Sequence, residues 1–343
     1  MRTVALHPIG LVFRVHTRTV VTVTGLCATT LALFVLAIGT GDYPIPPGRV
    51  VETLLGHGDA GTTFVLETLR LPRALTALLV GAALGIAGAI FQSITRNPLG
   101  SPDIIGFTAG ASAAAVFGIV IFNAGSFGVA GSALAGGLLT TVAVYLLAYR
   151  GGVQGYRLVL VGIALSAMLY ALIDYLMTRA RIDDAYEAAI WMRGSLNGRG
   201  WEHVHPLALT LLVLTPALIV LSRPLRILEM GDDAAKALGI AVERTRLALI
   251  LVGVALTAVA TAAAGPIAFV ALAAPQIARR LTRASGPGLG AAGAMGAALL
   301  LASDLLTQHT FSATQLPVGI TTGVLGGGYL IWMLSREWKK GSS

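Results

Sequence analysis

The chain has 343 residues, of which 55% are apolar and only 12% are charged, and its mean hydropathy is +0.80. A soluble protein carries about a quarter charged residues, so this composition excludes an ordinary soluble domain. The formal net charge of +8 does not indicate nucleic-acid binding, because the basic residues lie between apolar blocks and form no single basic patch.

Uncharged apolar blocks follow one another along the chain. A bilayer core of about 30 Å needs roughly 20 helical residues, and the blocks lack the alternating polarity of barrel strands. We therefore predict an all-α polytopic membrane protein of about ten transmembrane helices, forming a single transmembrane domain over residues 1–343. The expected spans are 19–40, 72–95, 104–123, 126–149, 157–178, 203–222, 245–265, 267–284, 288–306 and 315–335.

The basic residues predict the topology of these spans. With the N-terminus inside, 17 of the 24 Lys and Arg residues fall on the cytoplasmic side, as the positive-inside rule requires. Both termini are therefore expected in the cytoplasm, at a cytoplasmic (inner) membrane. Two external segments follow, 42–71 and 179–202.

Pairs of glycines at a spacing of four predict close helix packing. Small residues at that interval let helix backbones approach in lipid, where no hydrophobic force drives helices together. The pairs are Gly81 and Gly85, Gly106 and Gly110, and Gly323 and Gly327.

The sequence offers little chemistry of its own. No Gly-Lys pair is present, which excludes a phosphate loop of the Gly-x4-Gly-Lys-Ser/Thr type. Only Asp174 and Asp304 are candidate charged residues near membrane depth, so an ion-coupled carrier is disfavoured. The lone Cys27 and the His203 and His205 pair indicate neither a metal site nor a cofactor. We expect any energy for transport to come from a partner.

Two arginines open the second predicted span on the external side. Pro72 suits a first helical turn, and Arg70 and Arg73 are spaced to project together. Because arginine recognises carboxylates at two points, the pair is a candidate docking surface for an acidic partner. The alternative is interfacial anchoring of long side chains.

Uncharged polar residues end the same span. Gln92, Ser93, Thr95 and Asn97 supply hydrogen-bonding groups near a candidate pathway exit. They serve equally well for bonding to neighbouring backbones, which is the alternative.

Residues 231–239 form the most informative polar connection. Asp232 is expected to be the N-cap of a two-turn helix that Gly239 ends. Ala234, Ala235 and Leu238 are expected to share one small apolar face. This pattern favours a short cytoplasmic helix that fits a groove in another protein, and a helix lying on the membrane is the alternative.

Several of these strings, taken in order, resemble the FecCD family of ATP-binding-cassette (ABC) importer permeases for siderophores, haem and vitamin B12. They are Arg70-Leu71-Pro72-Arg73 and residues 97–102, 231–239, 265–270 with 274–279, and 316–319. The resemblance implies a type II ABC importer permease fold and a non-catalytic subunit. It also implies a second permease subunit, two ABC ATPase subunits and a substrate-binding lipoprotein or periplasmic protein.

The resemblance also implies roles for particular residues. Arg70 and Arg73 match arginines that dock the binding protein, and His309 lies where some members carry a further arginine. Gln276 stands where many members have histidine. A coupling helix that contacts the ATPase matches Gly231, Asp232, Asp233, Ala234, Ala235, Lys236, Leu238 and Gly239.

Residues 191–201 resemble the variant found in ferric-enterobactin-type permeases. This favours a ferric siderophore, of the catecholate kind, over haem or cobalamin, and a heterodimer over a homodimer. A stand-alone secondary transporter and a membrane enzyme remain as rivals without a supporting motif.

Overall fold

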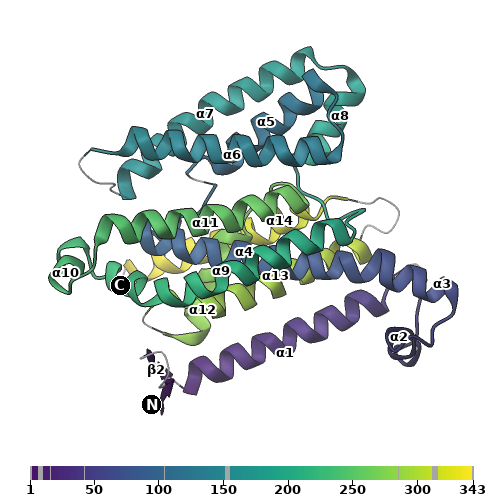
Figure 1. Ribbon diagram of the computed structural model, residues 1–343, viewed down its shortest axis with the longest axis horizontal. Helices are drawn as coiled ribbons and strands as arrows, with labels where there is room; N and C mark the ends of the chain where they lie inside the picture. Colours follow the sequence, from purple (N-terminus) through teal and green to yellow (C-terminus); the bar gives the residue numbers. More distant parts are fainter. Residues whose placement is uncertain are drawn as a thin grey trace.

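The computed structural model describes residues 2–6, 11–15, 17–41, 43–103, 105–150, 155–284, 286–310 and 316–341. In this part of the chain, long helices run side by side in a bundle, and one short antiparallel pair of strands precedes them (Figure 1). The strands are β1 (Arg2–Leu6) and β2 (Leu11–Val15). The helices are α1 (Thr17–Gly39), α2 (Pro47–Leu54), α3 (Ala60–Thr63), the π-helix η2 (Phe64–Arg70), α4 (Leu71–Thr95), α5 (Phe107–Phe122), α6 (Ser126–Ala148), α7 (Gly155–Arg179), α8 (Ile182–Trp191), α9 (Trp201–Leu228), α10 (Asp232–Ala237), α11 (Val242–Ala264), α12 (Val270–Thr282), α13 (Leu289–Thr310) and α14 (Val318–Gly341).

The expected helical membrane fold is confirmed, and each of the ten predicted spans corresponds to one helix. Seven helices of the described chain are long and apolar enough to cross a membrane: α1, the continuous run Ala60–Thr95, α6, α7, α9, α11 and α13. Shorter apolar helices cover Phe107–Phe122 and Val318–Met333. The predicted boundaries at residues 42, 104 and 315 lie outside the described residues.

The eighth predicted span, 267–284, is longer than the helix observed there. Helix α12 has 13 residues, about 20 Å at about 1.5 Å each, which falls short of a bilayer core. It begins at Val270 because Gly265 has φ +73°, Pro266 follows, and Phe269 is left-handed at φ +68°. This break delays the helix by three residues.

The second span also begins differently from the prediction. The helix starts at Ala60, inside the expected external segment, and runs through η2 into α4. Its π-helical turn precedes Pro72, which lacks the N–H that an unbroken α-helix would need. Two short helices, α2 and α8, lie within the expected external segments. Helix α9 continues to Leu228, past Pro216 and Pro224.

Helix α4 forms the centre of the bundle and packs closely on α13. A Cβ on Gly85 would lie 2.2 Å from the Ala292 carbonyl oxygen, and one on Gly81 would lie 2.4 Å from that of Gly296. Contacts this short leave no room for a side chain, so the predicted packing seam is confirmed here. Gly110 packs on α6 in the same way, because a Cβ there would lie 2.7 Å from the Gly136 carbonyl oxygen.

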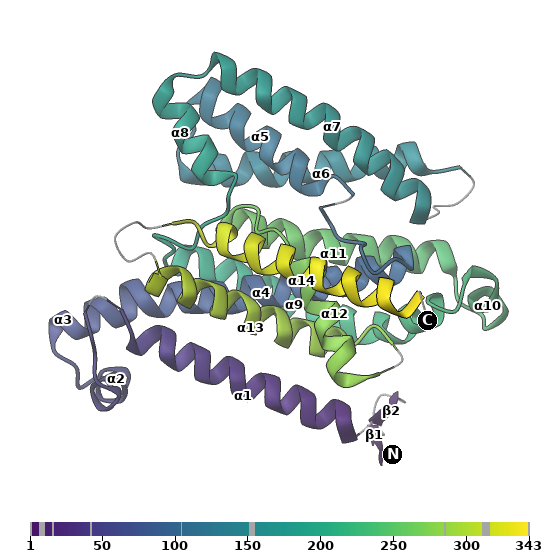
Figure 2. The same ribbon diagram turned by 180° about the vertical axis from the view of Figure 1, so that it is seen from behind.

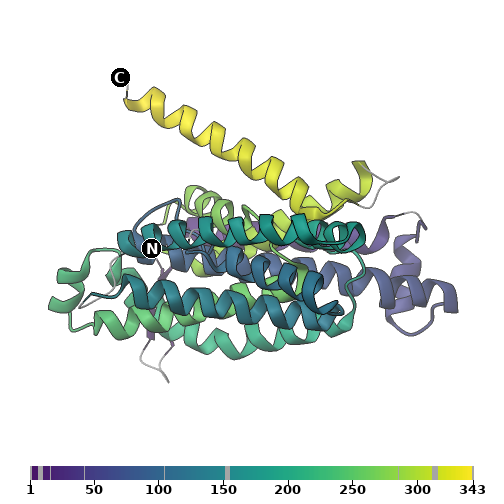
Figure 3. The same cartoon turned by 90° about the horizontal axis from the view of Figure 1, so that it is seen from above.

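The third glycine pair has no such neighbour in the described chain. A Cβ on Gly323 or Gly327 of α14 would meet nothing within 4 Å. Helix α14 crosses the back of the bundle, and its C-terminal part diverges from the other helices (Figures 2 and 3). The predicted seam at this pair is therefore not made within the described chain.

The two ends of the bundle carry different elements. Helix α10, the N-terminus of α1 and the C-terminus of α14 lie at one end, and α2, α3 and α8 lie at the other (Figures 1 and 2). We call these the α10 end and the α8 end. Helices α5 to α8 form a group on one side of α4, and α1 lies on the opposite side.

Candidate coupling and docking sites

Helix α10 is held to the bundle through Asp232. Both carboxylate oxygens of Asp232 accept hydrogen bonds from Nη2 of Arg246, at 2.9 Å each, and Arg96 lies 3.4 Å away. The expectation that Asp232 is the N-cap is wrong. Gly231, at φ +113°, takes that position, and the Asp232 side chain makes no cap bond because it faces Arg246.

The end of α10 follows the prediction. Gly239 adopts φ +80°, which costs glycine little because it has no Cβ. The N–H of Gly239 donates to the Lys236 carbonyl at 2.9 Å, and the N–H of Ile240 donates to the Ala235 carbonyl at 2.9 Å. This pair of bonds is the Schellman arrangement that closes a helix.

The expected apolar face of α10 is divided between two directions. Ala235 is fully buried against the bundle, whereas Leu238 is 60% exposed. Asp233 and Lys236 are also exposed, and Ala234 is half-buried. The exposed surface of α10 is therefore Leu238 with its polar neighbours, and Ala235 belongs to the interior.

A second polar network lies just before α10. Glu229 follows the last residue of α9 and accepts a 2.6 Å hydrogen bond from the Ser93 hydroxyl at the end of α4. Nη1 of Arg279 on α12 lies 3.8 Å from the same Glu229 oxygen. These contacts join α9, α4 and α12 at the α10 end.

The candidate pathway residues are engaged within the chain. Gln92 is 2% exposed. It donates to the Leu272 carbonyl at 3.0 Å and accepts from Gln276 at 2.7 Å and Arg279 at 3.1 Å. Ser93 is equally buried and bound to Glu229. Both side chains thus bridge helices.

The other two candidates bond locally, as the alternative interpretation stated. The Thr95 hydroxyl donates to the Phe91 carbonyl at 2.7 Å, one turn earlier. Asn97 accepts from the N–H of Leu99 at 2.9 Å and so stabilises the turn after α4. A cavity of about 240 Å³ borders Gln92, Ser93 and Asn97.

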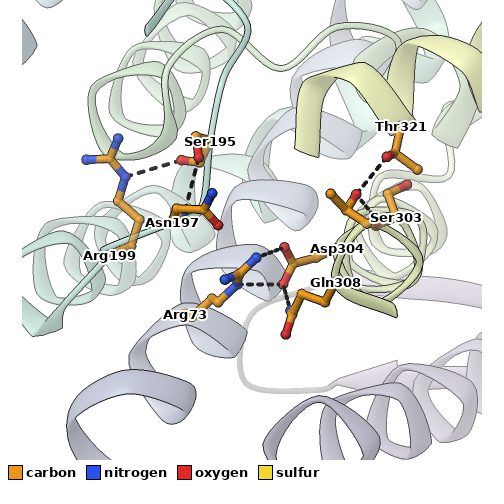
Figure 4. A network of polar contacts seen from close by, with 9 residues as sticks. Arg73, Ser195, Asn197, Arg199, Ser303, Asp304, Gln308 and Thr321 are labelled. Carbon is orange, nitrogen blue, oxygen red and sulfur yellow. Dashed lines mark hydrogen bonds and ion pairs between the residues drawn. The ribbon is translucent and has the colours of Figure 1, made fainter. Parts of the chain in front are cut away.

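The two arginines at the α8 end do not project together. Arg73 donates through Nε and Nη2 to the two oxygens of Asp304, at 3.0 and 2.8 Å (Figure 4). Arg70 instead donates to the carbonyls of Ile38 and Tyr43, at 3.1 and 2.5 Å. Each arginine therefore joins a different part of the chain to α4.

The third docking candidate lies on α13. His309 is exposed, and its Nε2 is 3.3 Å from the Thr40 hydroxyl. This contact places it beside the end of α1, near the Ile38 carbonyl that Arg70 contacts.

A further cavity of about 680 Å³ lies at the α8 end, among α6, α8, α9 and α11. Arg199 lines it, donates to the Ser195 carbonyl at 3.2 Å (Figure 4), and contacts His203 at 3.0 Å. Burial lowers the pKa of the Arg199 guanidinium. Among the described residues, no group of three His, Cys, Asp or Glu side chains is placed to hold a metal ion.

Sequence reasoning missed the residues that anchor the candidate sites. Arg246 and Glu229 were not among the predicted site residues, and Asp304 was considered only as a candidate charged residue near membrane depth. Their charge was visible in the sequence. Their partners were not, because Asp304 lies 231 positions from Arg73 and Glu229 lies 136 from Ser93.

Comparison with solved structures identifies the class. The chain superposes on a protein assigned to the metal-chelate type of ABC transporter, captured in an inward-facing conformation, with a TM-score of 0.82 and 28% identity. The match covers 92% of this chain and 98% of the other. With its apolar spans, the fold is that of a multi-pass membrane permease of the ABC transporter class.

The chain belongs to the FecCD transport family, whose model matches residues 29–336. It is 44% identical over 326 residues to the ferric enterobactin transport system permease protein FepG of Escherichia coli K12, covering 95% of this chain and 99% of the relative. It is 37% identical to the achromobactin transport system permease protein CbrC of Dickeya dadantii 3937, covering 90% and 89%.

Proposed function

We propose that this chain is the membrane-spanning permease subunit of an ATP-driven importer that carries a ferric siderophore, of the catecholate kind, across the cytoplasmic membrane. The observation that carries the proposal is the 44% identity to a ferric enterobactin permease across nearly the full length of both chains. The 28%-identical metal-chelate transporter fold supports the same class of cargo.

The subunit itself hydrolyses no ATP in this proposal. Two separate ATPase subunits bind at the α10 end, where the exposed Leu238 and Lys236 offer a small protruding surface. Movement of α10 on ATP binding and hydrolysis rocks the helices, so that the pathway opens alternately to the two sides. The N-terminus of α1 and the C-terminus of α14 lie at the α10 end, so the proposal predicts that both termini are in the cytoplasm.

A substrate-binding lipoprotein or periplasmic protein docks at the opposite, α8 end. Arg70 ends η2, Arg73 lies in the first turn of α4, and His309 lies in the last turn of α13 beside Thr40. Arg70 supplies positive charge for an acidic partner, and Arg73 would exchange its internal partner Asp304 for a carboxylate of the binding protein. Raising the salt concentration should weaken this docking, because exposed charge pairs are screened beyond about 8 Å at physiological ionic strength.

A second permease subunit completes the pathway. Helix α7 exposes apolar side chains along its length, including Ile163, Met168 and Leu172, and α14 carries the unfilled glycine face of Gly323 and Gly327. Either lipid or another subunit covers such faces. The small residues on α14 favour close contact with another helix, and we propose a heterodimer.

Reconstitution tests the whole proposal. Vesicles would hold this chain, its second permease and its ATPase, with the binding protein outside and radioactive iron supplied as one chelate at a time. We expect ATP-dependent accumulation of a ferric catecholate in preference to ferric hydroxamate, ferric citrate, haem or cobalamin. Preference for haem or cobalamin would change the proposed cargo but keep the class of ATP-driven importer. Accumulation by this chain alone would replace the proposal with a secondary transporter.

A further inference from the structure

The ion pair between Asp232 and Arg246 ties α10 to α11. Nη2 of Arg246 donates to both oxygens of Asp232, and Nη1 donates to Glu243 at 2.8 Å. Arg246 lies in the second turn of α11 and is 4% exposed. One buried guanidinium therefore joins the first turn of α10 to the first turns of a long helix.

The partners of Asp232 indicate what its carboxylate is for. Both oxygens face a guanidinium that a neighbouring protein could not reach. In the described part of the chain, α10 forms its side-chain ion pairs through Asp232, with Arg246 and Arg96. Leu238 and Lys236 are exposed to solvent.

The backbone of α10 supplies a reason for such a tie. Glycines with positive φ, Gly231 at +113° and Gly239 at +80°, bracket the helix. Gly231 separates Asp232 from Glu229, which is bound to α4 and lies near Arg279 of α12. Between two such glycines, a six-residue helix keeps its orientation through its side chains, and here these are the buried Ala235 and the Asp232 pair.

We propose that Arg246 is a positioning residue for energy coupling, and that Asp232 is an internal anchor through which movement of α10 reaches α11, rather than a contact for the ATPase. This inference rests on the proposed function, because it assumes that an ATPase moves α10. A displacement applied at Leu238 reaches α11 through the ion pair and α4 through Arg96. Helix α11 in turn packs on α4: a Cβ on Gly253 would lie 3.0 Å from the Phe91 ring.

The test uses the complete importer in vesicles and measures two rates, ATP hydrolysis and iron uptake. The variants are Asp232→Asn, Arg246→Gln, the two combined, and Arg246→Lys. Arg244→Gln is the matched control, because it removes one exposed positive charge from α11 two residues before Arg246. The ATPase that co-purifies with each permease is measured as well.

We expect Asp232→Asn and Arg246→Gln each to lower uptake per ATP about tenfold, and the combined variant to lower it no further, as for two residues that act through one contact. Arg246→Lys should restore part of the loss, because it keeps the charge but not the two-sided geometry. Each assembled complex should retain its ATPase, and Arg244→Gln should behave as the parent.

Three results would overturn the inference. Loss of the ATPase in Asp232→Asn but not in Arg246→Gln would make Asp232 a partner contact. Additive losses in the combined variant would separate the two residues. If Arg246→Gln does not assemble, Arg246→Lys is measured in its place. A smaller yield of complex from Arg246→Lys, with unchanged uptake per ATP, would reduce the pair to a structural role. If the parent importer shows no ATP-dependent uptake, the proposed function fails and not this inference alone.

Discussion

Arg73 and Asp304 form a two-point ion pair across the α8 end of the bundle, with donor–acceptor distances of 3.0 and 2.8 Å. Asp304 is 2% exposed and also accepts a 2.8 Å bond from Gln308. A buried carboxylate needs its charge partner to remain ionised. The pair therefore fixes the start of α4 against the end of α13. The same two helices pack closely at Gly81 and Gly296.

Asp304→Asn should destabilise the protein by about 1–3 kcal/mol, because the substitution removes the buried half of a two-point ion pair whose other half, Arg73, is partly exposed. Thermal or denaturant unfolding of the purified chain in detergent measures the change. The exposed Asp183 of α8, changed to Asn in the same way, is the control and should change stability little. Equal effects of the two substitutions would show that burial of Asp304 does not matter.

The same pair separates folding from docking. Arg73→Gln removes the guanidinium from the candidate docking surface, whereas Asp304→Asn leaves it in place and released from its carboxylate. If Arg73 docks the binding protein, Arg73→Gln should weaken that affinity about tenfold, within the range of interface charge pairs. Asp304→Asn should preserve it. Titration of the binding protein onto the permease complex provides the measurement, and equal losses would assign Arg73 to internal structure.

The fold was predictable from the sequence where local patterns decide it. The apolar blocks predicted ten spans, and each span corresponds to a helix because apolar stretches of this length form helices in a bilayer. The spacing of Gly81 and Gly85 predicted the α4–α13 seam. Helix α8 was missed because residues 179–202 are rich in charge, which hid a ten-residue helix with Asp183 and Asp184 in its first turn. The early start of the second span was missed because Pro72 indicated a helix beginning.

The candidate sites were only partly predictable, since a sequence shows which groups are charged but not which groups meet. Asp232 was expected to cap its own helix, and it instead binds Arg246, fourteen positions later. Ala235 was expected on the exposed face and packs inward. Gln92 and Ser93 were candidates for a pathway and lie in a network between helices. In each case the contact was set by a residue elsewhere in the chain, which the local pattern could not identify.

Gly85→Ala should destabilise the chain by about 1–3 kcal/mol, the usual cost of an added methyl group in a fully packed contact. Its Cβ would lie 2.2 Å from the Ala292 carbonyl oxygen, which is backbone and cannot rotate away. Gly290→Ala on α13 is the matched control, because nothing lies within 4 Å of that position. Unfolding in detergent compares the two, and equal stabilities would contradict the close packing of α4 on α13.

Gly323→Leu should leave the isolated chain folded and weaken its pairing with a second permease subunit. In the described chain nothing lies within 4 Å of a Cβ at this position, so a larger side chain meets no resistance until another helix packs on α14. Gly25→Leu on α1 adds the same bulk at an equally open site, on a helix outside the proposed interface. The fraction of paired subunits, measured by cross-linking or energy transfer in detergent, should fall for Gly323→Leu alone. Unchanged pairing would show that this glycine face meets lipid.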